Sequence, residues 1–252
     1  MCFLSLDWCM DSCQSAPMDQ SSRQPTHIPF VFPGLEHIQC VFTTRFGAHR
    51  TESGNRRKQI QEMLAPSWLD MEQTHGTDMA FIRDPKSQYA DSRPKADALA
   101  TDLSHQALVV SVADCQPLLL AHASGRFIAA MHVGWRANRA DAPGLWVQRM
   151  CSEYKILPQE ILAVRGPSLG PGWSEFVNFQ QEWGHEFEAY FHPQPQTVDL
   201  WDMTREQLQQ AGLRRECIFS LDLCTYSLPQ LFYSYRRDKT IGRQAGIIWI
   251  SN

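Results

Sequence analysis

The stretch ADCQPLLLAHASGRFIAAMHVGWR, residues 113–136, constrains the fold of this 252-residue sequence more than any other stretch. Two apolar runs flank the tetrapeptide Ala-Ser-Gly-Arg, whose Ser-Gly centre is typical of a tight turn. The pattern predicts a β-hairpin whose turn is centred between Ser124 and Gly125. In that register His132 lies opposite Pro117.

The same hairpin brings a cysteine toward a histidine. Cys115 precedes Pro117 by two positions, so the alternation of a strand points both side chains to the sheet face of His132. Such diagonal neighbours lie about 7–8 Å apart between Cα atoms, which lets both side chains reach one metal ion. A one-residue bulge would turn His132 to the other face, and a buried cysteine is often an ordinary core residue. The spacing alone therefore leaves two interpretations open, a Cys/His site and two unrelated core residues.

A third candidate ligand is His75, which stands beside Gly76 in QTHGTD, where the backbone can turn sharply. Considered alone, His75 reads as a loop histidine. Together with Cys115 and His132 it completes a set of three ligands drawn from three segments. Three protein ligands with an open fourth position fit a catalytic metal site.

Composition excludes several classes of protein. With 43% hydrophobic and 20% charged residues, the chain is ordinary for a globular protein that buries a full core. A net charge of −4 without a basic stripe gives no reason to expect a nucleic-acid partner. The longest apolar runs are far shorter than the roughly 20 residues of a membrane-spanning helix. Eight cysteines without a Cys-x-x-Cys pair indicate a reducing, cytoplasmic location.

The N-terminal segment differs from the rest of the chain. Residues 1–24 carry three of the eight cysteines, lack a basic region and are interrupted early by Asp7, unlike a secretory signal. We expect a disordered leader or a mis-assigned start, with Met18 as the alternative initiator. Residues 25–252 are then expected to form one domain.

The remaining elements alternate between short groups of strands and single helices. Clusters of strands separated by single helices predict mixed β-sheets with helices outside. Strands are expected near residues 38–47, 107–112, 218–224 and 245–250, and residues 161–172 are expected to form a strand that runs into a Gly/Pro loop. Helices are expected at 53–65, 142–156, 176–191 and 202–213.

Five ordered motifs make the sequence similar to a known family. They are QTHGTD, ADALATD with VVSVADCQPLLL, AAMHVGWR, ILAVRGPSLGP and FYSYRRDKTIGRQAGIIWI. In this order they resemble the multicopper polyphenol oxidase/laccase-domain family, whose members are also called purine nucleoside phosphorylases or peptidoglycan editing factors. The resemblance covers residues 28–250. It implies an α+β fold, a four-layer α/β/β/α sandwich with mixed β-sheets in a single domain.

The resemblance also implies a function. It places a zinc centre at His75, Cys115 and His132, with copper as the less favoured metal. The implied reaction is phosphorolysis of adenosine, inosine and S-methyl-5′-thioadenosine, with adenosine deamination in some members. The expected partners are therefore a small nucleoside and phosphate, for a monomer or a homodimer.

Phosphate binding needs cations, and three arginines lie within motifs that resemble those of the family. Arg45, Arg136 and Arg236 are candidates because a guanidinium matches phosphate oxygens in a bidentate fork. Arg45 is also a candidate catalytic residue beside the three metal ligands. Each arginine could equally form a structural ion pair at the surface.

Several positions depart from the family pattern. Glu175 is kept in GWSEFV although the cysteines expected around it are absent, Thr204 stands where an asparagine is expected, and Ala137 replaces a glycine. The loops that shape the substrate site are therefore expected to differ from those of relatives. Asp114 is expected to orient a neighbour of the centre, and Trp135 to lie in the core. Structural roles are expected for three other histidines, His105, His122 and His185.

Three other functions stay open. A His/His/Cys set also suits copper, as in a polyphenol oxidase, although nine scattered histidines without a His-x-His pair argue against a multicopper cluster. Cys115 could act as a nucleophile with His132 as its base, in an amidase for a peptidoglycan precursor. A binding domain without activity is the last alternative, because the loop motifs depart from the family.

Overall fold

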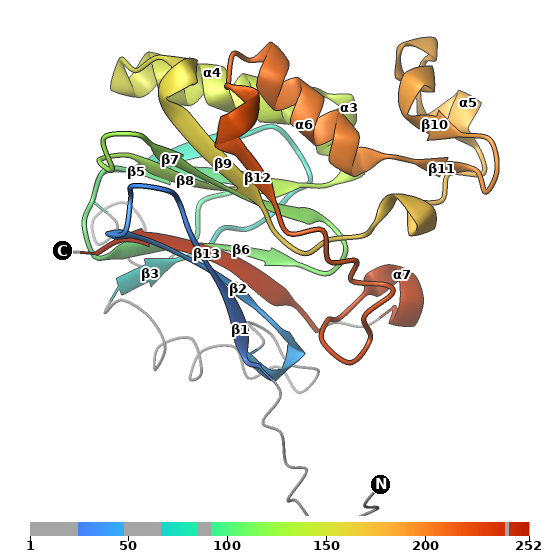
Figure 1. The fold of residues 1–252 in the computed structure, drawn as a ribbon, viewed down its shortest axis with the longest axis horizontal. Helices are drawn as coiled ribbons and strands as arrows, with labels where there is room; N and C mark the ends of the chain where they lie inside the picture. The colour runs from blue at the N-terminus through green and yellow to red at the C-terminus, as the bar shows by residue number, and fades with distance from the viewer. Residues whose placement is uncertain (1–24, 48–66, 85–91, 240–241, 252) are drawn as a thin grey trace, which may run out of the picture.

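Two stacked β-sheets, covered on one side by helices, form the molecule (Figure 1). The computed structural model describes residues 25–47, 67–84, 92–239 and 242–251. Both sheets contain parallel and antiparallel pairs, as predicted for a single α+β domain. The predicted helix at 53–65 and the N-terminal segment 1–24 lie outside the described residues. Of the four predicted layers, the described residues form one helical layer and the two sheets.

The first sheet has five strands in the order β1-β2-β13-β6-β3. Their bounds are β1 His27–Val31, β2 Ile38–Thr43, β3 Ser67–Leu69, β6 Gln106–Val112 and β13 Gln244–Ile250. The C-terminal strand β13 lies in the middle and pairs antiparallel with both β2 and β6. The sheet therefore depends on pairings between the two ends of the chain.

The second sheet has six strands in the order β12-β9-β7-β8-β5-β4. Their bounds are β4 Met79–Ile82, β5 Ala98–Thr101, β7 Gln116–His122, β8 Ile128–Val133, β9 Ile161–Arg165 and β12 Ile218–Ser220. The β7–β8 hairpin lies at its centre with Pro117 opposite His132, so the predicted register is confirmed. Gly125 has a φ of +69° in the turn, and a Cβ there would overlap the His37 ring. The turn therefore requires glycine.

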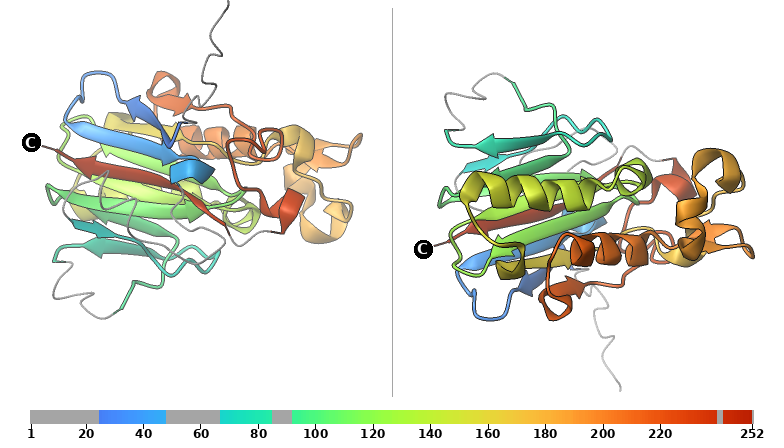
Figure 2. Two further views of the ribbon diagram at one scale, coloured as in Figure 1. Left: turned by 90° about the horizontal axis from the view of Figure 1, so that it is seen from below. Right: turned by 90° about the horizontal axis from the view of Figure 1, so that it is seen from above.

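Two apolar layers hold the elements together. Between the sheets, Leu119 and Ala130 of the hairpin pack with Val110 and Ile248 of the first sheet. On the outer face, the alternate hairpin side chains pack against the helices α3 Trp135–Arg139, α4 Ala142–Tyr154 and α6 Leu200–Gln210. Figure 2 shows these helices lying across one face of the second sheet. The helices predicted at 142–156 and 202–213 are thus confirmed. Among the described helices, none is long and apolar enough to cross a membrane.

The predicted helix at 176–191 is wrong. That segment forms the short α5 Phe179–Glu182, a 3₁₀ helix at His185–Tyr190 and the strand β10 Phe191–His192, which pairs with β11 Thr197–Val198. Gly184 adopts an extended conformation and interrupts the helix. The aromatic side chains pack on one another instead of forming one helical face, as in the stacked rings of Phe179 and Phe191.

The other elements are short. They are the helix α7 Tyr235–Asp238 and the 3₁₀ helices Arg45–Gly47, Pro158–Glu160, Pro171–Trp173 and Arg215–Cys217. The predicted strand at 218–224 is confirmed only for β12. The Leu221 N–H still bonds to the Arg165 carbonyl of β9, but the Leu223 N–H bonds to the Leu221 carbonyl in a local turn.

Candidate metal centre

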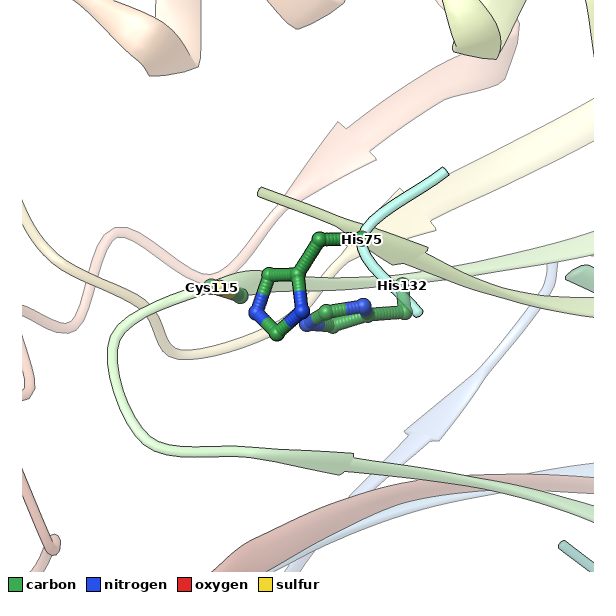
Figure 3. Close-up of side chains that lie close together, drawn as sticks. All are labelled: His75, Cys115 and His132. Carbon is green, nitrogen blue, oxygen red and sulfur yellow. The ribbon is translucent and has the colours of Figure 1, made fainter. Parts of the chain in front are cut away.

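Three separate segments bring His75, Cys115 and His132 together (Figure 3). His75 lies in the loop between β3 and β4, Cys115 in the connection between β6 and β7, and His132 near the end of β8. One ligand atom from each residue lies within 4.8 Å of the others, and the two imidazole rings meet edge to face at 4.8 Å. His132 is buried, Cys115 is half-buried and His75 is exposed. The group is therefore accessible from one side.

Asp97, a buried residue immediately before β5, holds both histidines. Its carboxylate accepts hydrogen bonds from His132 Nδ1 at 2.8 Å and from the backbone N–H groups of His75 at 2.9 Å and Gly76 at 2.7 Å. The hydroxyl of Thr74 donates to the same carboxylate at 2.7 Å. These bonds support a His75 backbone with a φ of +60°, in the left-handed region. Asp97 therefore fixes the loop of one histidine and the ring of the other.

Sequence reasoning missed Asp97 and assigned an orienting role to Asp114. The Asp114 carboxylate instead accepts from Thr225 Oγ1 at 2.7 Å and from the Arg236 backbone N–H at 2.6 Å. A φ of +95° at Asp114 ends the strand alternation on which that expectation relied. The sequence offered one signal for Asp97, its place in the motif ADALATD that resembles the family.

The charges of the centre are coupled. Burial alone would raise the pKa of Cys115, but the charge of His132 and hydrogen bonds from His132 and His75 outweigh burial and lower it. Burial alone would lower the pKa of His132, but the Cys115 charge and the Asp97 hydrogen bond raise it. Burial would also raise the pKa of Asp97, yet hydrogen bonds from His132, Thr74 and Gly76 lower it to about 2. The metal-free centre therefore favours a thiolate beside an imidazolium.

Gly134 lies directly against two of the three candidate ligands, Cys115 and His75. A Cβ at this position would lie 3.2 Å from Cys115 Sγ and 3.5 Å from His75 Cδ2. Ordinary carbon–sulfur contacts are longer, so any side chain here would push on the thiol. The glycine of the HVGWR motif thus allows the backbone to approach two of the three candidate ligands.

The ligand types and their surroundings fit a metal ion. Two histidines and a cysteine are donors that zinc accepts in catalytic sites, which keep a fourth position open. The Asp97 bond occupies Nδ1 of His132 and leaves Nε2 for a metal, the arrangement typical of metal-bound histidines. His75, Cys115 and His132 are therefore the described residues that could hold an ion.

The centre lies in the wall of a cavity of about 670 Å³. Cationic side chains from several segments line the same cavity, among them Arg93, Arg136, Arg236 and Lys239. Apolar and aromatic side chains from α3, α6 and the loop after β9 also line it. A ligand of nucleoside size could therefore contact the candidate metal ligands and the cations together.

The three predicted arginines occupy different surroundings. The Arg136 guanidinium lies 4.3 Å over the Trp135 ring, and Arg236 donates to the Glu175 carbonyl at 3.2 Å. Both line the cavity. Arg45 lies elsewhere: it donates to the Pro229 carbonyl at 2.6 Å and covers the Tyr233 ring at 4.9 Å. The structure brings two of the three arginines to the cavity and leaves Arg45 outside it.

The remaining candidates lie as follows. Trp135 is half-buried, packs against the Phe176 and Trp183 rings and also lines the cavity. His122 binds Ser124 at the hairpin turn, and His185 pairs with Glu188 at the surface. His105 has a φ of +60° at the start of β6, and its backbone N–H donates to the Ile250 carbonyl.

Comparison with known proteins now decides the family. The family model described as "Multi-copper polyphenol oxidoreductase laccase" matches residues 46–251. The chain belongs to this family. The laccase-domain resemblance is thereby confirmed, and the family is one of metal-binding, copper-oxidase-like domains.

Relatives within the family carry one recurrent name. The chain is 33% identical over 207 residues to "Purine nucleoside phosphorylase" of Xylella fastidiosa (strain Temecula1), covering 78% of this chain and 77% of that protein. It is 34% identical over 191 residues to "Purine nucleoside phosphorylase YfiH" of Escherichia coli (strain K12), covering 73% and 74%. The crystal structure of YlmD from Geobacillus stearothermophilus has the same fold, with a TM-score of 0.77 at 22% identity over 92% of this chain and 98% of that one.

Proposed function

We propose that the chain is a zinc-dependent purine nucleoside phosphorylase that uses adenosine, inosine and S-methyl-5′-thioadenosine. The observation that carries the proposal is one cavity that contains both the His75–Cys115–His132 group and several cations. The names of the relatives agree with it. A zinc ion held by these three residues would supply a Lewis acid at the cavity wall.

The cations of the cavity suit the second substrate. In phosphorolysis an oxygen of phosphate forms a bond to C1′ of the ribose while the bond from C1′ to the purine nitrogen breaks. The base leaves with the bonding electron pair and takes up a proton, which yields ribose 1-phosphate and free base. We assign phosphate binding to Arg136 and Arg236, because both line the cavity and a guanidinium can bind two phosphate oxygens. The contribution of Arg45 would be indirect, through the packing of Tyr233.

Adenosine deamination is proposed as a second activity of the same cavity. Water replaces the 6-amino group of adenosine, and the products are inosine and ammonia. Because this reaction needs no phosphate, the two activities separate in a single assay.

Two alternatives have an observation in their favour. The family description names copper, but the described part of the chain contains a single group of three candidate ligands, whereas a multicopper enzyme needs several. Cys115, His132 and Asp97 also form a nucleophile, a base and an orienting carboxylate, which would suit a cysteine-dependent amidase acting on a peptidoglycan precursor. Metal content separates the two from the main proposal.

The test combines metal analysis with product analysis. We expect protein purified without added metal to contain about one zinc ion per chain, and to release adenine from adenosine only when phosphate is present. Stoichiometric copper would favour the oxidase. A metal-free protein whose Cys115 is trapped by an alkylating substrate analogue would favour the amidase.

A further inference from the structure

Asp114 connects several segments of the chain at the cavity. It lies between β6 and β7, directly before Cys115, and both residues line the cavity. The Asp114 carboxylate accepts from the Thr225 hydroxyl at 2.7 Å and from the Arg236 backbone N–H at 2.6 Å. The Asp114 carbonyl accepts from the Leu169 N–H at 2.8 Å. The residue next to a candidate metal ligand is therefore bonded to the loop after β9, to the segment before α7 and to α7.

The conformation of Asp114 depends on these bonds. Its φ of +95° is one that residues with a side chain adopt only where the surrounding contacts impose it. One partner of the carboxylate, Thr225, is fully buried, and its own N–H bonds to the Ser168 carbonyl at 3.0 Å. The carboxylate is thus anchored through one oxygen to a fixed group and holds the Arg236 backbone with the other.

Arg236 is held at both ends. Asp114 binds its backbone, and its guanidinium donates to the Glu175 carbonyl at 3.2 Å and lies 3.7 Å from the Glu175 carboxylate. Both side chains of this ion pair are partly exposed, so the pair is weak and a phosphate can replace it. The next residue, Arg237, instead bonds to three backbone carbonyls of the chain between β12 and α7. Of these two arginines, Arg236 is the one that lines the cavity.

We propose that Asp114 is a positioning residue for phosphate. By holding the Arg236 backbone, it fixes the start of α7 and keeps the Arg236 guanidinium at the cavity that also contains Cys115. The inference rests on the proposed function, since it takes Arg236 as a phosphate-binding residue. A carboxylate by itself repels an anion. Loss of the positioning role therefore weakens phosphate binding, whereas loss of the charge alone strengthens it.

Two substitutions separate position from charge. Asp114→Gly removes the carboxylate, and glycine adopts a φ of +95° without strain. Asp114→Asn removes the charge, but its oxygen can still accept from the Arg236 N–H while its NH₂ group donates to the Thr225 hydroxyl. Inorganic phosphate is titrated into the metal-loaded full chain without nucleoside and followed by ³¹P NMR. We expect the glycine variant to bind phosphate about tenfold more weakly, and the asparagine variant to bind it at least as tightly as the parent.

Lys155→Gly is the matched control. Lys155 also has a positive φ, +56°, but it follows α4 and is not among the residues that line the cavity. We expect this variant to keep the phosphate Kd of the parent. Arg236→Ala, alone and combined with Asp114→Gly, completes a double-mutant cycle. If Asp114 acts through Arg236, the double variant binds phosphate no more weakly than Arg236→Ala alone.

Turnover gives a second measurement. For Asp114→Gly we expect the KM for phosphate to rise about tenfold, while kcat at saturating phosphate and the KM for adenosine stay within about twofold of the parent. A general loss of structure would instead lower kcat and zinc content together. If Asp114→Gly does not fold, Thr225→Val removes the anchor of the carboxylate and is expected to weaken phosphate binding about threefold.

Phosphate binding by Asp114→Gly that equals or exceeds that of the parent would overturn the proposal. Additive effects in the double variant, an asparagine variant as weak as the glycine variant, or unchanged binding by Thr225→Val would also overturn it, as would a parent that binds no phosphate. The expected binding pattern without phosphorolysis would contradict the proposed function and leave the positioning role standing. Phosphorolysis with unchanged phosphate binding in Asp114→Gly would do the reverse.

Discussion

At the scale of single residues, Asp97 connects the two histidines of the centre through one carboxylate. It bonds to the ring of His132 and to the backbone beside His75. Residues that orient metal-binding histidines in this way are typically worth a factor of about 10–100 in metal affinity. The positions of both histidines therefore depend on a residue that is not one of the three candidate ligands.

Asp97→Asn tests that dependence. An asparagine offers one acceptor oxygen in place of two, so we expect zinc affinity to fall about 10- to 100-fold in competition with a chromophoric chelator. Asp102→Asn is the matched control, because Asp102 pairs with Arg83 at the surface. Equal affinities of the two variants would show that Asp97 does not position the ligands.

The charge coupling of Cys115 and His132 predicts a pH dependence in metal-stripped protein. A lowered thiol pKa means that thiolate persists at pH values below the usual range near 8.5. We expect Cys115 to react with iodoacetamide at these lower pH values, as followed by mass spectrometry of its peptide. His132→Asn removes the stabilising charge and should move the midpoint of the reaction upward. A midpoint that is the same in both proteins would contradict the coupling.

Local sequence patterns predicted the position of His132 but not the positions of Asp97 and Arg45. The pairing of His132 with Pro117 was predictable because a short turn sets the register. Asp97 was not, since it reaches His132 only through the pairing of β5 with β8, which no local pattern specifies. The position of Arg45 outside the cavity likewise depends on the distant residues Pro229 and Tyr233.

Among the elements of the fold, the short connection between β8 and α3 places the Gly134 backbone against two of the three candidate metal ligands. Gly134 has a φ of −88°, which any residue can adopt, so only the space beside Cys115 requires glycine. For Gly134→Ala we expect about tenfold weaker zinc binding with nearly unchanged stability of the metal-free protein.

Gly172→Ala is the control for that substitution, since a Cβ there would meet nothing within 4 Å. Isothermal titration of zinc into both variants makes the comparison. Zinc affinity that is identical in the two would show that the contact with Cys115 does not matter.

A buried polar network joins β7 to the helices above it. Thr204 Oγ1 of α6 accepts from Gln116 at 2.9 Å and from Asn138 of α3 at 2.8 Å. The sequence identified Thr204 as a departure from the family pattern, but its two donors come from elements distant in the chain. Thr204 therefore takes part in docking α6 onto the sheet.

Thr204→Val removes this acceptor without changing the shape of the side chain. We expect the free energy of unfolding in urea to fall by about 1–3 kcal/mol, because two buried donors lose a partner. Thr204→Ser keeps the hydroxyl and should recover most of that loss. A valine variant as stable as the parent would contradict the role of the network.

At the scale of the whole molecule, the cavity draws its walls from segments that lie far apart in the sequence. The residues that line it range from Asp70 to Arg243. The C-terminal strand β13 lies in the middle of the first sheet, between β2 and β6. The motifs predicted the fold class and the candidate metal ligands. The cavity itself could not be predicted, because its walls come from β7, the loop after β9 and α6, among other segments.

We propose that Cys115 supports both metal binding and nucleoside turnover. The most direct measurement is zinc content and phosphate-dependent adenine release, determined side by side for the parent protein and Cys115→Ala. Cys151→Ala is the control, because that half-buried cysteine belongs to α4 and is not among the residues that line the cavity. We predict that Cys115→Ala loses both zinc and turnover while Cys151→Ala keeps both. Full turnover by Cys115→Ala would contradict the assignment of the centre.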